Sequence, residues 1–248
     1  MQFYLSIDDT DNLDSPGSGQ LAEILAAKLQ QEGLVSHSSN ISRHQLFVDA
    51  AIPYTSHNSS MCFSATATDN RLGDIIEFSS QYLQKASAAG SDPGLCVAVA
   101  DSLLNGEALT EFGLKAKKTV LSKQEAYFLA SKTGIHLSEH GGTGDGIIGA
   151  LAGIGLRMQG NDGRFRGWLN LGECGDIVMT QSLCAHPWVD AVVDENGRPL
   201  AENTPVFLAD SRIKTVFWDH RQVIPVTATA GDTGPAWTTL TKSEVKRF

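Results

Sequence analysis

Carboxylates crowd together where a predicted strand ends near the start of the sequence. Residues 2–7 are mostly apolar, and Asp8, Asp9 and Asp11 follow at once, with Asp14 close behind. Carboxylates this close raise one another's pKa unless a cation or hydrogen-bond donors compensate. Proteins hold Mg²⁺ through one or two carboxylates together with waters and substrate phosphates. The pattern predicts a Mg²⁺ site at Asp8, Asp9 and Asp11, and the alternative is a solvated turn in which Asp11 or Asp14 caps the next helix.

A turn rich in glycine and serine separates these acids from the next predicted helix. It contains Gly17, Ser18 and Gly19. The start of a helix exposes unpaired amides and the positive end of the helix dipole, which bind anions. Glycines let a phosphate approach the backbone. Ser18 also suits a helix N-cap, so phosphate binding and capping are both open, and the two are compatible.

A second glycine-rich loop precedes a later helix and contains Gly142, Thr143, Gly144 and Gly146. It lacks the Lys-Ser/Thr pair that ends a Walker phosphate loop. Its amides can still bind phosphate at the helix start. Two such loops and an acidic cluster in one chain favour nucleotide chemistry more than any one of them alone.

Two further polar groups are weaker candidates. His136 and His140 are four residues apart, which suits metal ligands on one helix face. Gly134 indicates that the helix has already ended, so a polar loop is the favoured interpretation. Asn58 lies in a polar loop between two predicted strands, where it either forms a turn or contacts a ligand.

The elements that must position these residues alternate between strand and helix. Apolar runs predict strands, and apolar residues at helical spacing predict helices. The strands are expected at residues 3–7, 45–55, 61–68 and 95–100, and the helices at residues 21–29, 71–85, 122–132 and after residue 146. Short β-like runs follow residue 160, and an irregular tail is expected from Gly231. We therefore expect a mixed α/β (α+β) fold, with an ATP- and Mg²⁺-binding domain over residues 1–160 and a smaller strand-rich domain over residues 161–248.

Composition narrows the class of partner. The formal net charge is -9, from 28 acidic and 19 basic residues, which leaves no broad basic surface for a phosphate backbone. Nucleic acid is therefore not the default partner. The four cysteines show neither CxxC pairing nor zinc spacing, and no segment resembles a signal peptide or a membrane span. We expect a globular cytoplasmic protein.

Four motifs occur in an order that one known family shares. They are Leu5-Ser-Ile-Asp-Asp-Thr-Asp11, Ala51-Ile-Pro-Tyr54 followed by Asn58, Asp92-Pro-Gly94, and Gly144-Asp-Gly-Ile-Ile-Gly-Ala-Leu-Ala-Gly-Ile-Gly155. Over residues 3–160 the sequence resembles the archaeal agmatinyl-cytidine synthetase (TiaS) family, which modifies a minor isoleucine tRNA. The resemblance implies a kinase-type ATP-binding domain joined to a ferredoxin-like domain that helps to bind agmatine. The OB-fold and zinc ribbon that hold tRNA in the family have no counterpart here, so we expect a truncated, bacterial-type relative.

The resemblance also implies roles for single residues. Asp8, Asp9 and Asp11 match the acids that handle Mg²⁺ and phosphate. Ser18 falls where the family has a threonine that becomes phosphorylated, so the resemblance makes its hydroxyl a candidate phosphoryl acceptor. Asn58 falls on an asparagine that follows the Ile-Pro-Tyr motif. The implied activity is ATP- and Mg²⁺-dependent phosphoryl or nucleotidyl transfer, which activates a small polar substrate for attack by an amine such as agmatine, with tRNA left open as a partner.

Two other functions stay open. A nucleotide- or amine-binding regulator would keep the same site and lack turnover. A haloacid-dehalogenase-type phosphatase is suggested by Asp9-Thr-Asp11 after a strand, because that chemistry begins with a nucleophilic aspartate. The further acid that this mechanism needs soon after Asp145 is absent from the sequence, which ranks the phosphatase below the other two.

Overall fold

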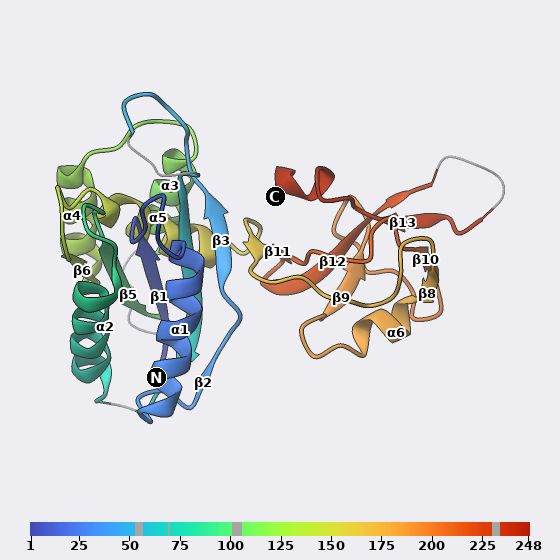
Figure 1. Cartoon of the computed structure of the whole chain (residues 1–248), viewed down its shortest axis with the longest axis horizontal. Coiled ribbons are helices and arrows are strands. Elements are labelled where there is room, and N and C mark those ends of the chain that lie inside the picture. The colour runs from blue at the N-terminus through green and yellow to red at the C-terminus, as the bar shows by residue number, and fades with distance from the viewer. Residues whose placement is uncertain (53–56, 69, 101–105, 230–233) are drawn as a thin grey trace. The chain divides into compact units, whose positions relative to one another are not determined.

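The computed structural model describes residues 1–52, 57–68, 70–100, 106–229 and 234–248 (Figure 1). Its contacts divide the chain into unit 1, Met1–Gln159, and unit 2, Gly160–Phe248. Each unit packs around apolar clusters of its own. Helices and strands are mixed in the way the sequence patterns predicted, so the mixed α/β class is confirmed. No helix in the described part of the chain is long and apolar enough to cross a membrane.

Unit 1 contains an antiparallel sheet with β1 at its centre. The strands run in the order β6-β5-β1-β4-β3, and β2 also pairs with β4. Their bounds are β1 Gln2–Asp8, β2 His37–Ser38, β3 Ser42–Gln45, β4 Ser59–Thr66, β5 Gly94–Val99 and β6 His136–Glu139. The helices are α1 Ser18–Gln31, α2 Leu72–Ala86, α3 Gly106–Ala116, α4 Lys123–Thr133 and α5 Gly146–Gln159.

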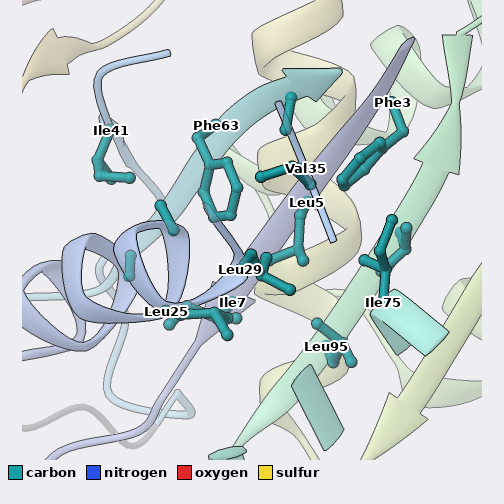
Figure 2. Close-up of a cluster of buried hydrophobic side chains, with 14 of the residues drawn as sticks. Phe3, Leu5, Ile7, Leu25, Leu29, Val35, Ile41, Phe63, Ile75 and Leu95 are labelled. Atoms are coloured by element: carbon teal, nitrogen blue, oxygen red, sulfur yellow. The ribbon is translucent and has the colours of Figure 1, made fainter. Parts of the chain in front are cut away.

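Side chains of β1 alternate between two cores, as a strand with two covered faces requires. Phe3, Leu5 and Ile7 enter a cluster with residues of α1 and α2. Figure 2 shows them beside Leu25 and Leu29 of α1. The opposite face of the sheet contributes to a second cluster, with residues of α3, α4 and α5.

Two glycines bring α5 close to that opposite face of β1. A Cβ added at Gly153 would lie 2.4 Å from the Ser6 Oγ, and one added at Gly149 would lie 1.6 Å from the Asp8 Oδ2. Gly149 and Gly153 are four apart and so share one helix face. The missing side chains therefore allow the close packing that buries the last residue of β1.

The strand predicted at residues 45–55 is wrong in position. The strand is β3, Ser42–Gln45, and residues 46–52 lie outside any strand. Its two buried side chains, Ser42 and His44, are polar, and the Ser42 Oγ lies 2.7 Å from the His44 Nε2. A search for apolar runs therefore does not detect this strand. It still pairs with β4, from Ser42 opposite Cys62 to Gln45 opposite Ser59. Pro53 and Tyr54 of the second motif lie outside the described residues.

The polar loop predicted around His136 is also wrong. Residues His136–Glu139 form β6, which pairs with β5 from Gly94 to Val97. Leu137 packs against the α3–α5 cluster. Pairing with a neighbouring strand, rather than the local sequence pattern, makes this polar segment a strand.

Unit 2 is built mainly of short strands. They are β7 Arg164–Phe165, β8 Ile177–Met179, β9 Ala191–Val193, β10 Pro205–Phe207, β11 Val216–Trp218, β12 Arg221–Ala228 and β13 Trp237–Thr239, joined by α6 Thr180–Cys184 and a terminal 3-10 helix, η2 Glu244–Arg247. β12 pairs with β9, β11 and β13. The irregular tail predicted from Gly231 is corrected by β13, which is too short to show periodicity and pairs with both β12 and β10.

Candidate active site

Strand register brings three loops of unit 1 to one edge of the sheet. Asp8 lies opposite Gly94 in the β1–β5 pair, and Gly94 lies opposite Glu139 in the β5–β6 pair. The loop after β1, the loop before β5 and the loop after β6 therefore meet. α5 begins at the same place, since a Cβ added at Gly146 would lie 2.0 Å from the Asp92 carbonyl oxygen. The acidic cluster and the second glycine loop are thus brought together.

Asp8 is almost fully buried, with 7% of its surface exposed. Burial, followed by the charge of the neighbouring Asp9 carboxylate, raises its pKa from 3.8 to about 8. Desolvation disfavours the ionised form because the surroundings cannot replace water. At neutral pH this carboxyl therefore holds a proton unless a cation is bound beside it.

Asp9 has a left-handed backbone conformation, with φ 51°. Aspartate tolerates this region better than most residues with a side chain. Burial raises the pKa of Asp9 from 3.8 to about 6, followed by the charges of Asp92, Asp11 and Asp145. These three acids come from separate loops, so their joint effect on Asp9 shows that the acidic site extends beyond the first cluster.

Ser18 connects the first loop to α1 through its hydroxyl. The hydroxyl donates to the Asp11 Oδ1 at 2.6 Å and accepts from the Thr10 amide at 3.2 Å and the Thr10 hydroxyl at 3.0 Å. The N-cap of α1 is Gly17 rather than Ser18, so the capping interpretation of Ser18 is wrong. Asp11 also accepts from the Ser18 amide at 3.3 Å, and so satisfies one amide at the helix start.

The second loop packs closely against two carboxylates. The Thr143 amide donates to the Asp92 Oδ1, and its hydroxyl donates to Oδ2 at 2.9 Å. A Cβ at Gly142, where φ is 56°, would lie 1.6 Å from the Asp92 Oδ1. At Gly144, with φ 81°, it would lie 1.9 Å from the Glu139 Oε2. These contacts account for the two glycines, and they give the Thr143 amide an acceptor already.

Sequence reasoning missed Asp92 and Lys123 as site residues. The Lys123 ammonium donates to the Thr143 carbonyl and lies 3.5 Å from the Glu139 Oε1. The sequence did contain a signal for Asp92, because this residue opens the Asp-Pro-Gly motif. The sequence contains no such signal for Lys123, since its contact with the loop depends on how α4 packs beside it.

Asn58, His136 and His140 bond to other residues of unit 1. The Asn58 side-chain amide donates to the Phe47 carbonyl at 2.6 Å, a contact that joins the two ends of the connection between β3 and β4. The ring nitrogens of His136 and His140 each lie 2.8 Å from the Ser138 Oγ. Contact of Asn58 with a substrate stays a prediction.

No group of three or more His, Cys, Asp or Glu side chains stands ready to hold a metal ion among the residues that the structure describes. The acids around Asp9 nevertheless fit Mg²⁺, because this ion needs only one or two carboxylates when phosphates and waters complete its shell. Burial and then the neighbouring carboxylates raise the pKa of Asp8 and Asp9, and a bound cation would offset both effects.

No protein-family model matches the sequence, and the curated proteins contain no match. Solved structures do match. TiaS in complex with tRNA and ATP has a TM-score of 0.55 at 25% identity, and a tRNA fluorescent labeling enzyme has a TM-score of 0.54 at 26% identity; each match covers 62% of this chain and 36% of the other. TiaS in complex with tRNA, AMPCPP and agmatine has a TM-score of 0.54 at 17% identity and covers 96% of this chain and 59% of the other.

The chain thus spans 36% to 59% of the length of these structures. The matches at 25% and 26% identity extend over 62% of the chain, and the match at 17% shows the shared fold over nearly all of it. The resemblance predicted from the four motifs is therefore confirmed by structure: this chain is similar to TiaS, the tRNA agmatidine synthetase.

Proposed function

We propose that unit 1 binds ATP with Mg²⁺ at the acidic sheet edge and transfers a phosphoryl or nucleotidyl group to a small polar substrate. The observation that carries this proposal is the convergence of Asp9 with Asp11, Asp92 and Asp145 beside the starts of α1 and α5. Transfer of this kind requires positioning and charge stabilisation more than covalent chemistry from the protein. The similarity to an ATP-bound TiaS structure supports ATP as the nucleotide.

Asp9 is the residue that we assign to Mg²⁺, together with Asp8, while Asp11 is left to hold the Ser18 hydroxyl. A bound Mg²⁺ would neutralise phosphate charge and polarise the phosphorus that is attacked. The amides at the start of α1, next to Gly17 and Gly19, would face the phosphates. The Lys123 ammonium lies beside the second loop, where it donates to the Thr143 carbonyl. If it turned away from this carbonyl, it would place a positive charge beside a phosphate oxygen.

Ser18 is proposed as a phosphoryl acceptor. Its hydroxyl already donates to the Asp11 carboxylate at 2.6 Å, which is the arrangement of a nucleophile with a general base. In the step, the Ser18 oxygen bonds to the γ-phosphorus, the bond to the ADP oxygen breaks, and the proton passes to Asp11. A phosphoserine would then carry the group onward, so peptide mass spectrometry after incubation with ATP tests this step directly.

The substrate class follows from the relatives and stays a proposal. A TiaS structure holds tRNA, an ATP analogue and agmatine, and the family resemblance implies a carbonyl group that is activated by phosphorylation and displaced by an amine such as agmatine. For this chain we propose the amine as second substrate. A nucleic acid carrying the carbonyl is one candidate, and a small polar molecule is the other.

The test is calorimetry with ATP, with and without Mg²⁺, followed by analysis for ADP or for AMP and pyrophosphate. Asp9→Asn should lower Mg²⁺-dependent turnover about 100-fold or more, the scale of losing one strong electrostatic group in a site. Asparagine tolerates the left-handed conformation of position 9, so the fold should survive. The exposed Asp14→Asn is the matched control and should keep full turnover. Equal turnover in both variants would refute the assignment, and tight ATP binding without any product would favour the regulator.

A further inference from the structure

Unit 2 carries three cations around a single indole ring. The Arg212 Cζ lies 5.0 Å from the centroid of the Trp168 ring, the Lys214 Nζ lies 4.5 Å from it, and the Lys242 Nζ lies 5.7 Å from it. We call these four residues the Trp168 cluster. The proposed activity of unit 1 gives this cluster no role.

Backbone pairing fixes the Trp168 side of the cluster. Leu169 and Ile213 form an antiparallel bridge in which each amide donates to the other's carbonyl at 2.9 Å. Both side chains are buried in the core of unit 2. Because neighbours on an extended chain point to opposite sides, Trp168, Arg212 and Lys214 share the other side. The arrangement is therefore set by the fold rather than by chance contact of flexible side chains.

Two further contacts hold the cationic groups in place. The Lys214 ammonium donates to the Gly167 carbonyl at 2.6 Å. Lys242 lies 3.5 Å from the Asp210 Oδ2, and its segment is anchored where the Ala209 amide donates to the Thr239 Oγ1 at 3.0 Å. Asp210 thus contributes a carboxylate to the rim of the cluster.

Three cations near one ring repel one another, and the ring quadrupole and the single Asp210 carboxylate offset this only in part. A compact anion with several oxygens would offset it fully. The planar fork of Arg212 matches two oxygens of such an anion, and the two lysines supply point charges. We propose that the Trp168 cluster is a binding site for a phosphate group. The net charge of -9 disfavours long polyanions at a distance, so a small phosphorylated ligand is the occupant that this site fits better than a phosphodiester chain.

The experiment measures binding of inorganic pyrophosphate by calorimetry in EDTA. The double variant Arg212→Gln/Lys214→Gln should weaken binding about tenfold or more, since charged hydrogen bonds are lost. The matched control, Arg198→Gln/Lys246→Gln, removes one arginine and one lysine at exposed positions of unit 2, and should bind within about twofold of the parent chain. Asp9→Asn should not change this binding, which separates the site from that of unit 1.

Absence of pyrophosphate binding in the parent chain would overturn the proposal, and so would equal weakening in the two double variants. Thermal unfolding checks that both are folded, and the single variant Arg212→Gln replaces the double variant if that one is not. A labelled short single-stranded oligonucleotide then identifies the source of the phosphate. Binding that pyrophosphate displaces, and that Arg212→Gln weakens, would assign the site to phosphodiesters. Pyrophosphate binding without oligonucleotide binding would assign it to small phosphorylated ligands.

Discussion

The two units gather like charges in opposite environments. In unit 1, burial raises the pKa of Asp8 to about 8 and that of Asp9 to about 6. In unit 2, Arg212 and Lys242 are exposed beside the Trp168 ring, where water and the ring reduce their repulsion. Buried carboxylates can take up a proton or a cation, whereas arginine keeps its charge over the whole accessible pH range. The stability of unit 1 should therefore depend on pH and on divalent ions, and the stability of unit 2 should depend on salt and on anions.

Asp8→Asn is the substitution expected to change stability most. In the folded chain the pKa of Asp8 is raised from 3.8 to about 8, so the folded state binds a proton that the unfolded state releases between these values. Wild-type stability from this group is full below about pH 4 and is lost as pH rises toward 8. Asparagine has no such loss, so the variant should be more stable by about 2–4 kcal/mol at pH 8.5 without metal.

Urea unfolding at pH 4 and pH 8.5 in EDTA measures this difference. The gap between Asp8→Asn and the parent should be small at pH 4 and large at pH 8.5. Asp14→Asn removes a carboxylate from the same loop at an exposed position and should change neither value by more than about 0.5 kcal/mol. A variant that is less stable than the parent at pH 8.5 would show that Asp8 is not a desolvated carboxyl.

Gly149→Ala tests the packing that buries Asp8. An added Cβ would lie 1.6 Å from the Asp8 Oδ2, so α5 or the carboxylate must shift, at a cost of about 1–3 kcal/mol. Gly73→Ala is the control, because it also lies in a helix and its Cβ would meet nothing within 4 Å. Alanine there should be neutral or stabilising by up to about 1 kcal/mol. Equal effects at the two positions would mean that α5 does not press on the acidic site.

Arg212→Gln/Lys214→Gln tests the other half of the comparison. Lost contact with the Trp168 ring and relieved repulsion act in opposite directions, so the free energy of unfolding should change by less than about 1 kcal/mol. The change should be the same at pH 5 and pH 8.5. It should shrink at high salt. Strong pH dependence would contradict the distinction drawn between the units.

Local patterns were sufficient to predict β1, α1 and α5 and the acids between the first two, because each signal lies within one stretch of sequence. The position of β3 was not predicted because its buried side chains, Ser42 and His44, are polar and bond to each other. β13 was not predicted because three residues are too few to show a periodic pattern. Such segments become strands through partners elsewhere in the chain.

The candidate site was predicted only in part, for a similar reason. Asp8, Asp9 and Asp11 could be found from their spacing, but Asp92 joins them through the register that sets Asp8 opposite Gly94. The glycines of the second loop were interpreted as phosphate contacts, yet Asp92 and Glu139 occupy the space beside Gly142 and Gly144. A glycine pattern shows that something approaches the backbone closely, and only the fold shows what it is.

Glu125→Gln should have the smallest effect, and it should lower stability where Asp8→Asn raises it. The Lys115 ammonium donates to the Glu125 carboxylate at 2.8 Å, the Ser122 amide donates to it at 2.9 Å, and together they lower its pKa from 4.5 to about 2. This stability is full above pH 4.5 and is lost as pH falls toward 2. The side chain is exposed, so solvent limits the effect to about 0.5 kcal/mol at pH 7.

Glutamine can still complete the capping box with Ser122, so this substitution isolates the charge. Urea unfolding of parent and variant at pH 7 and pH 2.5 should show the difference shrinking as pH falls. For Asp8→Asn the difference in stability between variant and parent should also shrink as pH falls, but there the variant is the more stable protein. If both substitutions moved stability in the same direction, burial would not be what separates the acidic site from an ordinary carboxylate of the same unit.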